Sequence, residues 1–315
     1  MVRSILWDPS VNESIRESAG SAALVFEWLT HLGDGALLLV LGVLIYWFGA
    51  MENRRSRVFV IAVGVTALAL SAGLKGVVQL PRPDLAFAPQ NYPGYTFPSA
   101  HAMGSAAFYG ALAVTMEWGT RRRRYLLAGG VMAVVAASRV VMGVHYLGDV
   151  VVGVLLGLAL VAIGVRTREE GIFDPGPLFA LAVFIALGAA LLGSRVFVTL
   201  TLGASVGGLF GWRYVEGRPT TRSGAAVLVS GIGLLVVLGL LRVGSVWLGF
   251  ARPEGSLGSL FLVVEVLGYA VLTALVLLLP WLAARIEDRP TVRWLQSELP
   301  FRSRTIDLES VHSGD

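Results

Sequence analysis

The feature that most constrains this chain is a series of nine long apolar segments separated by short polar ones. The segments cover residues 34–50, 58–80, 100–119, 125–143, 147–165, 176–193, 196–212, 225–249 and 258–283. A transmembrane helix needs about 20 mostly apolar residues, and each segment approaches or exceeds that length. We find no strand pattern in the chain. The segments therefore predict an all-α polytopic membrane protein with about nine transmembrane helices.

The composition agrees with this class. Hydrophobic residues make up 55% of the chain and charged residues 15%, whereas soluble domains carry about 25% charged residues. The chain has 38 glycines, and small residues let membrane helices approach closely. We expect Gly203, Gly207 and Gly208 to serve this packing. The absence of cysteine excludes disulfides and thiolate metal sites.

The arginines predict how the helices are oriented. Of the 25 Lys and Arg residues only Lys75 is a lysine, and seventeen of the 24 arginines lie in five alternate polar segments. These are 51–57, 120–125, 165–170, 212–222 and the stretch after residue 284. Because cytoplasmic loops are rich in Lys and Arg, we expect these segments in the cytoplasm. The N-terminus and the connections 81–99, 144–147, 194–195 and 250–257 then face outward.

Two segments flank the predicted helices. Residues 10–31 alternate polar and apolar positions and contain Trp28, which is typical of an amphipathic helix at the membrane interface. The tail from residue 287 is polar and is expected to be poorly ordered. We divide the chain into an N-terminal interfacial segment (1–33), a core containing helices one to five (34–167), a C-terminal bundle of four additional helices (168–286) and a cytoplasmic tail (287–315).

One ion pair is predicted inside the C-terminal bundle. Arg242 lies about 12 Å below the outer end of the eighth span, and Glu265 lies at a similar depth in the ninth. Charged groups at such depth are rare and usually paired, so we expect a structural pair between them. The alternative is that Glu265 pairs elsewhere or is protonated and hydrogen-bonded.

Three polar stretches on the predicted outer side carry the unusual residues. The first is KGVVQLPRPD (75–84). Lys75 and Arg82 are seven residues apart, so we expect them on one helix face about two turns apart. Pro81 and Pro83 should end that helix.

The second stretch is FPSAH (97–101). Proline is favoured in the first turn of a helix, so we expect Pro98 to open the third span. Ser99 and the free backbone N–H groups would then lie at a positive helix end, which suits an anion. His101 falls in the same turn.

The third stretch is SRVVMGVHYLGD (138–149). In one straight helix Arg139 and His145 would point about 120° apart, whereas a break near Gly143 would let both face one point. His145 and Asp149 are four residues apart and should be neighbours. A nucleophilic imidazole needs one free nitrogen and an acceptor for the other, which Asp149 can supply.

These residue types together suit phosphoryl transfer. A second histidine can protonate a leaving oxygen. Three cations and a helix N-terminus can stabilise charge on the oxygens of a phosphoryl group. For any one of these residues an interfacial, snorkelling role is the ordinary alternative. The ordered set of seven favours a site.

The motifs K-x6-RP (Lys75 to Pro83), PSAH (98–101) and SR-x5-H-x3-D (138–149) also resemble the signature of the type-2 phosphatidic acid phosphatase superfamily. That superfamily includes bacterial acid phosphatases and vanadium haloperoxidases. The resemblance covers about residues 34–165, with the motifs in order and their internal spacings intact.

The resemblance implies a role for each residue. His145 would be the nucleophile that forms a phosphohistidine, Asp149 would orient it, and His101 would be the general acid. The phosphate would be held by four side chains and one backbone N–H: Lys75, Arg82, Ser99 and Arg139, with the N–H of Ala100. Alanine at position 100 departs from the glycine usual in the family, which should affect affinity more than chemistry. The resemblance implies no metal and no other cofactor.

We therefore expect a lipid phosphatase that acts on a lipid phosphate or a polyprenyl diphosphate at the outer face of a membrane. The protein would be integral to a prokaryotic cell membrane, with membrane lipids around it and no nucleic-acid partner. The lipid tail and the oligomeric state leave no signal in the sequence.

Two alternatives stay open. A head-group transferase would use the same core, with an alcohol replacing water in the second step. A lipid or ion carrier would keep the core only as a relic and transport through the C-terminal helices. Glu265 and the additional spans are its support, whereas the intact motifs argue against it.

Overall fold

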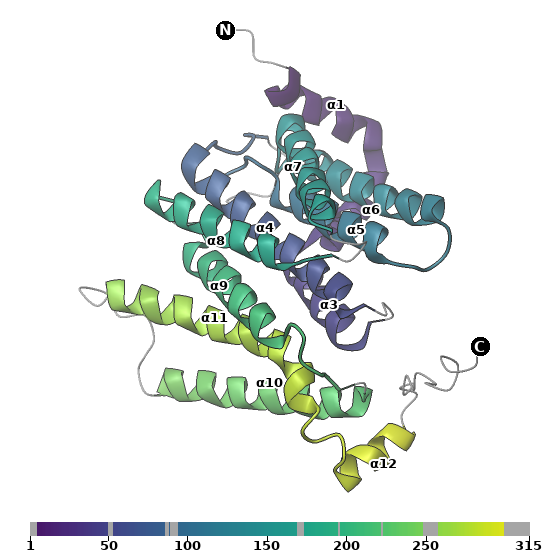
Figure 1. Ribbon diagram of the computed structural model, residues 1–315. Coiled ribbons are helices and arrows are strands. Elements are labelled where there is room, and N and C mark those ends of the chain that lie inside the picture. Colours follow the sequence, from purple (N-terminus) through teal and green to yellow (C-terminus); the bar gives the residue numbers. More distant parts are fainter. Residues whose placement is uncertain are drawn as a thin grey trace.

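The computed structural model describes residues 5–49, 53–85, 88, 94–168, 173–194, 196–221, 223–247 and 258–298. Within these residues every regular element is a helix (Figure 1). The α-helices are α1 (Pro9–Ala19), α2 (Ala23–Leu29), α3 (Gly35–Phe48), α4 (Arg54–Val78), α5 (Ala100–Thr115), α6 (Arg121–Val141), α7 (Leu147–Arg166), α8 (Gly176–Leu191), α9 (Val198–Val215), α10 (Gly224–Trp247), α11 (Gly258–Ala283) and α12 (Pro290–Glu298). Three 3₁₀ helices, η1 (Ile5–Trp7), η2 (Gly20–Ala22) and η3 (Thr30–Gly33), lie in the N-terminal part. The predicted all-α architecture is confirmed.

The nine predicted spans correspond one to one to helices α3 to α11. Among the described residues, four helices are long and apolar enough to cross a membrane: α4, α6, α7 and α11 over Leu262–Ala283. A fifth span results if the N-terminal helices and α3, which are bent by 47°, count as one. The membrane character is confirmed, and the number of nine spans stays a prediction.

Close packing brings the starts of α5 and α7 together. A Cβ on Gly153 would lie 2.9 Å from the carbonyl oxygen of Ser99, and a Cβ on Gly157 would lie 2.5 Å from that of Met103. Only glycine permits this approach, which is how small residues pack membrane helices. The backbone N–H of Ser99 also donates to the carbonyl of Asp149 at 3.1 Å. Two helix N-termini therefore lie side by side.

The hydrophobic core continues from the first helices into the C-terminal bundle. One buried cluster joins α3, α4, α5 and α7 to α8, α9 and α11, and it includes Phe59, Phe108, Phe179, Trp212 and Leu277. The glycines of α9 permit part of this contact. Gly203 and Gly207 lie directly against α11, and Gly208 lies against the ring of Phe179 in α8. The predicted close packing of this span is confirmed.

The end of α4 differs from the expectation. The helix ends at Val78 because Gln79 adopts a left-handed conformation with φ 52°. The next residue precedes Pro81, and the position before a proline disfavours helical geometry. Arg82 therefore lies in the extended segment after α4. The expectation that it shares a helix face with Lys75 is wrong.

The predicted start of α5 is wrong, whereas the predicted break between α6 and α7 is confirmed. Pro98 does not open α5, because Ser99 is the N-cap and its hydroxyl accepts the N–H of Ala102 at 3.4 Å. The positive helix end is present, two residues later than expected. The predicted break near Gly143 is confirmed: α6 ends at Val141, Gly143 has φ 67°, and α7 begins only at Leu147.

The N-terminal segment is not one straight helix. It divides into α1, η2, α2 and η3, and Gly20, the first residue of η2, has φ 50°. The purple α1 (Figure 1) packs against α6, and η1 packs against α7.

Candidate active site

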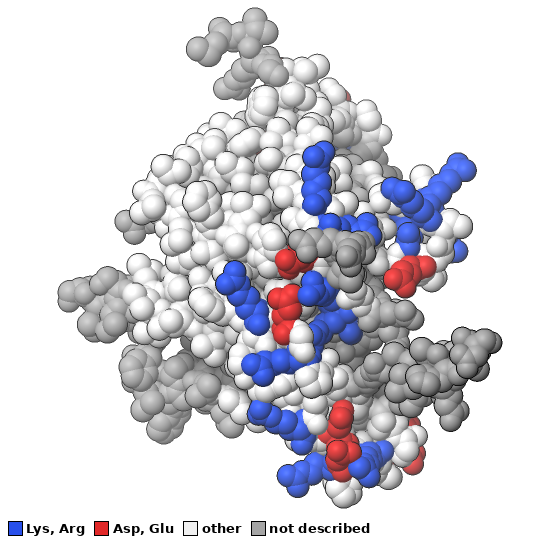
Figure 2. All heavy atoms as spheres, in the orientation of Figure 1, with Lys and Arg blue, Asp and Glu red and all other residues white. Residues whose placement is uncertain are grey.

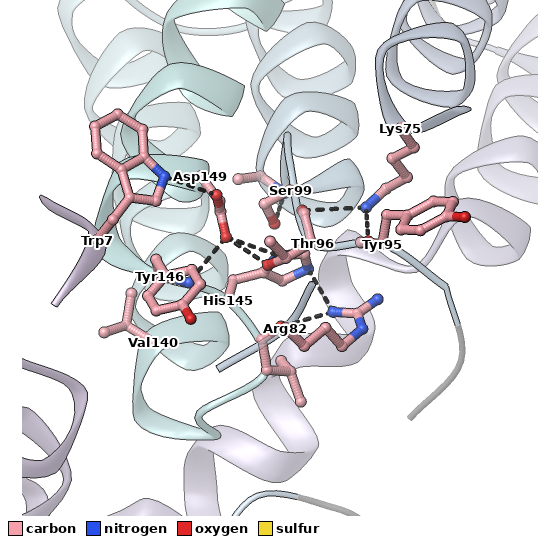
Figure 3. A network of polar contacts seen from close by, with 12 residues as sticks. Trp7, Lys75, Arg82, Tyr95, Thr96, Ser99, Val140, His145, Tyr146 and Asp149 are labelled. Atoms are coloured by element: carbon pink, nitrogen blue, oxygen red, sulfur yellow. Dashed lines mark hydrogen bonds and ion pairs between the residues drawn. The ribbon is translucent and has the colours of Figure 1, made fainter. Parts of the chain in front are cut away.

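Residues from all three polar stretches meet in one buried network (Figure 3). The first stretch contributes Lys75 and Arg82, the second contributes Ser99, and the third contributes His145 and Asp149. The network lies where the segment after α4, the start of α5 and the turn between α6 and α7 converge. The predicted convergence of the three stretches is thus present in the structure.

His145 lies in the turn before α7 and is only 2% exposed. Its Nε2 atom is 3.3 Å from Nη1 of Arg82. Its Nδ1 atom is 2.9 Å from the hydroxyl of Thr96 and 3.6 Å from Oδ2 of Asp149. The imidazole is therefore held from both sides, with one nitrogen toward a cation and the other toward a hydroxyl and a carboxylate.

Asp149 is fully buried and accepts hydrogen bonds from three donors. Its Oδ2 accepts from the Thr96 hydroxyl at 2.5 Å and from the backbone N–H of Tyr146 at 2.9 Å. Its Oδ1 accepts from the indole N–H of Trp7 at 3.3 Å. An ionised carboxylate only accepts, so this set of donors suits the charged form. Because Tyr146 is the N-cap of α7, Asp149 also caps its own helix.

Lys75 and Arg82 fix the backbone around the histidine. Nζ of Lys75 donates to the carbonyls of Tyr95 at 2.6 Å and Thr96 at 3.2 Å. Nη1 of Arg82 donates to the carbonyl of Val144 at 2.6 Å. An ammonium has three donors, so Lys75 can still donate to an anion. Phosphate binding by Lys75 and Arg82 stays a prediction.

The start of α5 supplies the N-terminal helix end. Ser99 is buried at the N-cap, and Ala100 and His101 follow as the first two helical residues. The first N–H groups of a helix have no partner within it, so these positions can donate to an anion. His101 is partly buried and lies close to η3, where a Cβ on Gly33 would be 3.4 Å from the Cβ of His101.

The N-terminal segment reaches the third stretch. Arg139 is 2% exposed, and its Nη1 donates to the hydroxyl of Thr30 at 2.6 Å. The side-chain amide of Asn12 donates to the carbonyls of Val140 at 3.0 Å and His145 at 2.9 Å. The turn that carries His145 is therefore held from outside the motifs.

Burial lowers the pKa of His145 well below its ordinary value, and the nearby cations of Lys75, Arg139 and Arg82 lower it further. The ring is therefore neutral near pH 7, with a lone pair on one nitrogen. In the described part of the chain, no three His, Cys, Asp or Glu side chains form a group that could hold a metal ion.

Sequence reasoning missed four residues of this network: Trp7, Asn12, Thr30 and Thr96. Thr96 carries a weak signal, since it lies two residues before Pro98 of the second motif. The other three lie far from their partners in sequence. Trp7 and Asp149, for example, are 142 residues apart.

The fold and the network define an all-helical membrane protein with a buried histidine site, and comparison with known proteins identifies its family. The model of the PAP2 superfamily matches residues 55–172. Phosphatidylglycerophosphatase B of Bacillus subtilis (strain 168) is 32% identical over 145 residues, which are 43% of this chain and 70% of that protein. The chain belongs to the PAP2 superfamily. The expected class, a membrane lipid phosphatase, is confirmed at the level of the family.

A solved structure of the same superfamily is also similar. It is the crystal structure of a transmembrane PAP2-type phosphatidylglycerolphosphate phosphatase from Bacillus subtilis. It has 29% sequence identity and a TM-score of 0.44, and the match covers 51% of this chain and 87% of that one.

Proposed function

We propose that this protein transfers the phosphoryl group of a membrane lipid phosphate first to His145 and then to water. One observation carries the proposal: Nε2 of His145 faces Arg82, while Nδ1 is held by Thr96 and Asp149. A nucleophile of this kind needs a free nitrogen and a third group that orients the ring. The name of the Bacillus relative makes phosphatidylglycerophosphate the first substrate to test. Polyprenyl diphosphates are the second class.

In the first step the lone pair of His145 Nε2 attacks phosphorus. The N–P bond forms, the bond from phosphorus to the lipid oxygen breaks, and His101 gives that oxygen a proton. Lys75, Arg82 and Arg139, together with the N–H groups at the start of α5, stabilise the charge that spreads over the three equatorial oxygens.

In the second step a water molecule attacks the phosphohistidine. His101, now neutral, takes a proton from the water as the O–P bond forms and the N–P bond breaks. The electron pair returns to Nε2, and inorganic phosphate leaves. Both histidines thereby regain their starting states.

The test is a panel of lipid phosphates and diphosphates assayed in detergent with excess EDTA. Wild-type protein should release phosphate and form an acid-labile phosphoenzyme. His145→Ala should lose both, with turnover reduced by about 10³-fold or more. Near-normal turnover in His145→Ala would refute the nucleophile. Loss of activity in EDTA that magnesium restores would refute a metal-independent reaction. Added alcohols separate hydrolysis from phosphoryl transfer to an alcohol, because a transferase would convert the phosphohistidine and the alcohol into a new phosphate monoester.

His101 has its own signature in this panel. As the acid that protonates the leaving oxygen, it matters most for a poor leaving group. His101→Ala should therefore slow lipid phosphates more than nitrophenyl phosphate, whose leaving group is stable as an anion. Equal losses on both substrates would contradict the role.

We also propose that the site opens on the extracytoplasmic side. Support comes from the arginine-rich segments, whose described members are gathered on one part of the surface (Figure 2). Exposed examples are Arg121, Arg122, Arg123, Arg213, Arg218 and Arg293. Cysteines introduced at Asn91 and Thr120 test this with an impermeant thiol reagent. Asn91, which lies outside the described residues, should react in intact cells, and Thr120 only after lysis. The reverse pattern would refute the orientation.

A further inference from the structure

We propose that Thr96 is a positioning residue: its hydroxyl bridges His145 and Asp149 and fixes the imidazole with its proton on Nδ1 and its lone pair on Nε2. This inference deepens the proposed function and rests on it for its catalytic consequence. It adds a residue outside the three motifs to the machinery that prepares the nucleophile.

The contact at Nε2 shows which nitrogen of the imidazole carries the proton. Nη1 of Arg82 is 3.3 Å from Nε2 of His145, and a guanidinium has donors but no acceptor. Nε2 must therefore be the acceptor, which means that it carries the lone pair. In a neutral imidazole the proton is then on Nδ1.

The contacts at Nδ1 show which atom accepts its N–H and where the hydroxyl hydrogen of Thr96 points. N–H···O hydrogen bonds have donor–acceptor distances of about 2.7–3.2 Å. The Thr96 hydroxyl, at 2.9 Å from Nδ1, meets this limit, whereas Oδ2 of Asp149, at 3.6 Å, does not. The N–H at Nδ1 therefore donates a hydrogen bond to the hydroxyl oxygen of Thr96. The hydroxyl has one hydrogen of its own, and Asp149 accepts it at 2.5 Å.

The backbone of Thr96 is held in place by the first motif region. Its N–H donates to the carbonyl of Leu80 at 2.9 Å, and its own carbonyl accepts from Nζ of Lys75 at 3.2 Å. Thr96, His145 and Asp149 are all almost completely buried, so water does not readily replace the hydroxyl. When His145 becomes positive on phosphorylation, the polarised hydroxyl carries the stabilising effect of Asp149 to Nδ1.

Three variants test the bridge kinetically. Thr96→Val keeps the shape and removes the hydroxyl, and kcat should fall about 100-fold. This is less than the roughly 10⁴-fold loss that a wrong histidine tautomer causes in a serine protease, because Asp149 remains. KM should stay within about threefold, because the phosphate-binding cations are intact. Thr96→Ser keeps the hydroxyl and should restore kcat to within about threefold of wild type.

Thr66→Val is the matched control. Thr66 is also fully buried, and its hydroxyl donates only to backbone carbonyls, those of Ala62 and Leu178. The same substitution there should leave kcat unchanged. A kcat of Thr96→Val near that of wild type would overturn the bridge, and so would a Thr96→Ser variant as slow as Thr96→Val.

A second readout does not need activity. The chain has four histidines, so ¹⁵N-histidine spectra can be assigned with a His145→Gln variant. Wild type and Thr96→Ser should show His145 protonated on Nδ1, and Thr96→Val should show a shift toward Nε2. A wild-type ring protonated on Nε2 would refute the bridge. If wild type has this tautomer and yet no tested lipid releases phosphate, the proposed function fails while the bridge stands.

Discussion

The two flanks of the PAP2 core make hydrogen bonds to different parts of it. The N-terminal segment donates to the site itself, through Trp7 to Asp149 and through Asn12 to the carbonyl of His145. The C-terminal bundle is tied to the core near the start of α4. There Arg54 donates to the carbonyl of Val215 at 2.9 Å. Twenty-one residues of helix separate that position from Lys75, a distance of about 30 Å.

The bundle also contacts α4 further along, at Thr66, whose hydroxyl donates to the carbonyl of Leu178, and at its outer end. Ser194, just after α8, lies directly against Gly76, and its hydroxyl is 3.5 Å from the carbonyl of Ala72. The difference between the flanks is therefore one of chemistry. The N-terminal segment provides polar atoms to the catalytic turn, whereas the bundle provides apolar surface and hydrogen bonds along α3 and α4. Equal deletions in the two flanks should have unequal effects on turnover.

The largest expected effect is that of Asn12→Leu. This change removes the side-chain amide that donates to the carbonyls of Val140 and His145. A buried acceptor left without a partner costs about 1–3 kcal/mol. The turn can recover that energy only by moving, and a displacement of about 1 Å can cost 10²-fold in rate. We expect kcat to fall about 100-fold, measured with the best lipid of the panel, together with a lower melting temperature.

Ser205→Ala in α9 is the control for the other flank. Ser205 is fully buried like Asn12, and its hydroxyl donates to the carbonyl of Thr201 at 2.6 Å. It should affect the melting temperature without reducing kcat. If Asn12→Leu and Ser205→Ala lower kcat equally, the two flanks do not differ as proposed.

A smaller effect is expected from removing a single indole N–H. Trp7→Phe keeps a ring against Gly148 but removes the donor to Asp149. Hydrogen bonds to charged groups contribute about 1.5–3 kcal/mol, and this one is long at 3.3 Å. A loss at the low end of that range corresponds to about a tenfold decrease in kcat.

Trp47→Phe is the control, because it removes an indole N–H that donates to the C-terminal bundle. The indole N–H of Trp47 in α3 donates to the carbonyl of Val276 in α11 at 3.0 Å, so it ties the bundle to the core. We expect Trp47→Phe to keep the wild-type kcat and to lower the melting temperature slightly. A loss of turnover in Trp47→Phe as large as in Trp7→Phe would show that the bundle also supports catalysis.

The parts of the fold that follow from local physics were predictable from the sequence. Apolar length located nine helices, and the need to turn Arg139 and His145 toward one point located the break at Gly143. The end of α4 was misjudged because the prolines were given the role that Gln79 takes earlier. Which residue of such a stretch leaves the helix depends on local contacts that the pattern does not contain.

The site was predictable only where its residues form spaced motifs. Thr96, Trp7 and Asn12 act through one or two hydrogen bonds each, to partners 49 to 142 residues away. An isolated threonine, tryptophan or asparagine has no period and no spacing to identify it. Only the packing of η1, α1 and the 94–99 segment against the α6–α7 turn and the start of α7 gives these side chains their roles.

The smallest effect on turnover is expected from the predicted ion pair in the C-terminal bundle. Glu265 in α11 accepts a hydrogen bond from the hydroxyl of Thr199 in α9 at 3.2 Å. The side chain of Arg242 lies outside the described residues, so the Arg242–Glu265 pair stays a prediction. The Thr199 contact already shows that Glu265 faces a neighbouring helix. A carboxylate at this depth needs more than one neutral hydroxyl to offset its loss of hydration.

If Arg242 supplies that compensation, either single change strands a charge. Arg242→Ala and Glu265→Ala should each lower the melting temperature in detergent, since breaking a buried pair is costlier than removing it whole. Combining Arg242→Leu with Glu265→Leu should recover much of the loss. Turnover should stay within about twofold of wild type in all three proteins, because Glu265 contacts Thr199 and not the residues that hold His145. A double variant as unstable as the sum of its single variants would show that the two residues act independently. Glu265 would then depend on Thr199 alone, and Thr199→Val should destabilise the protein as much as Glu265→Ala does.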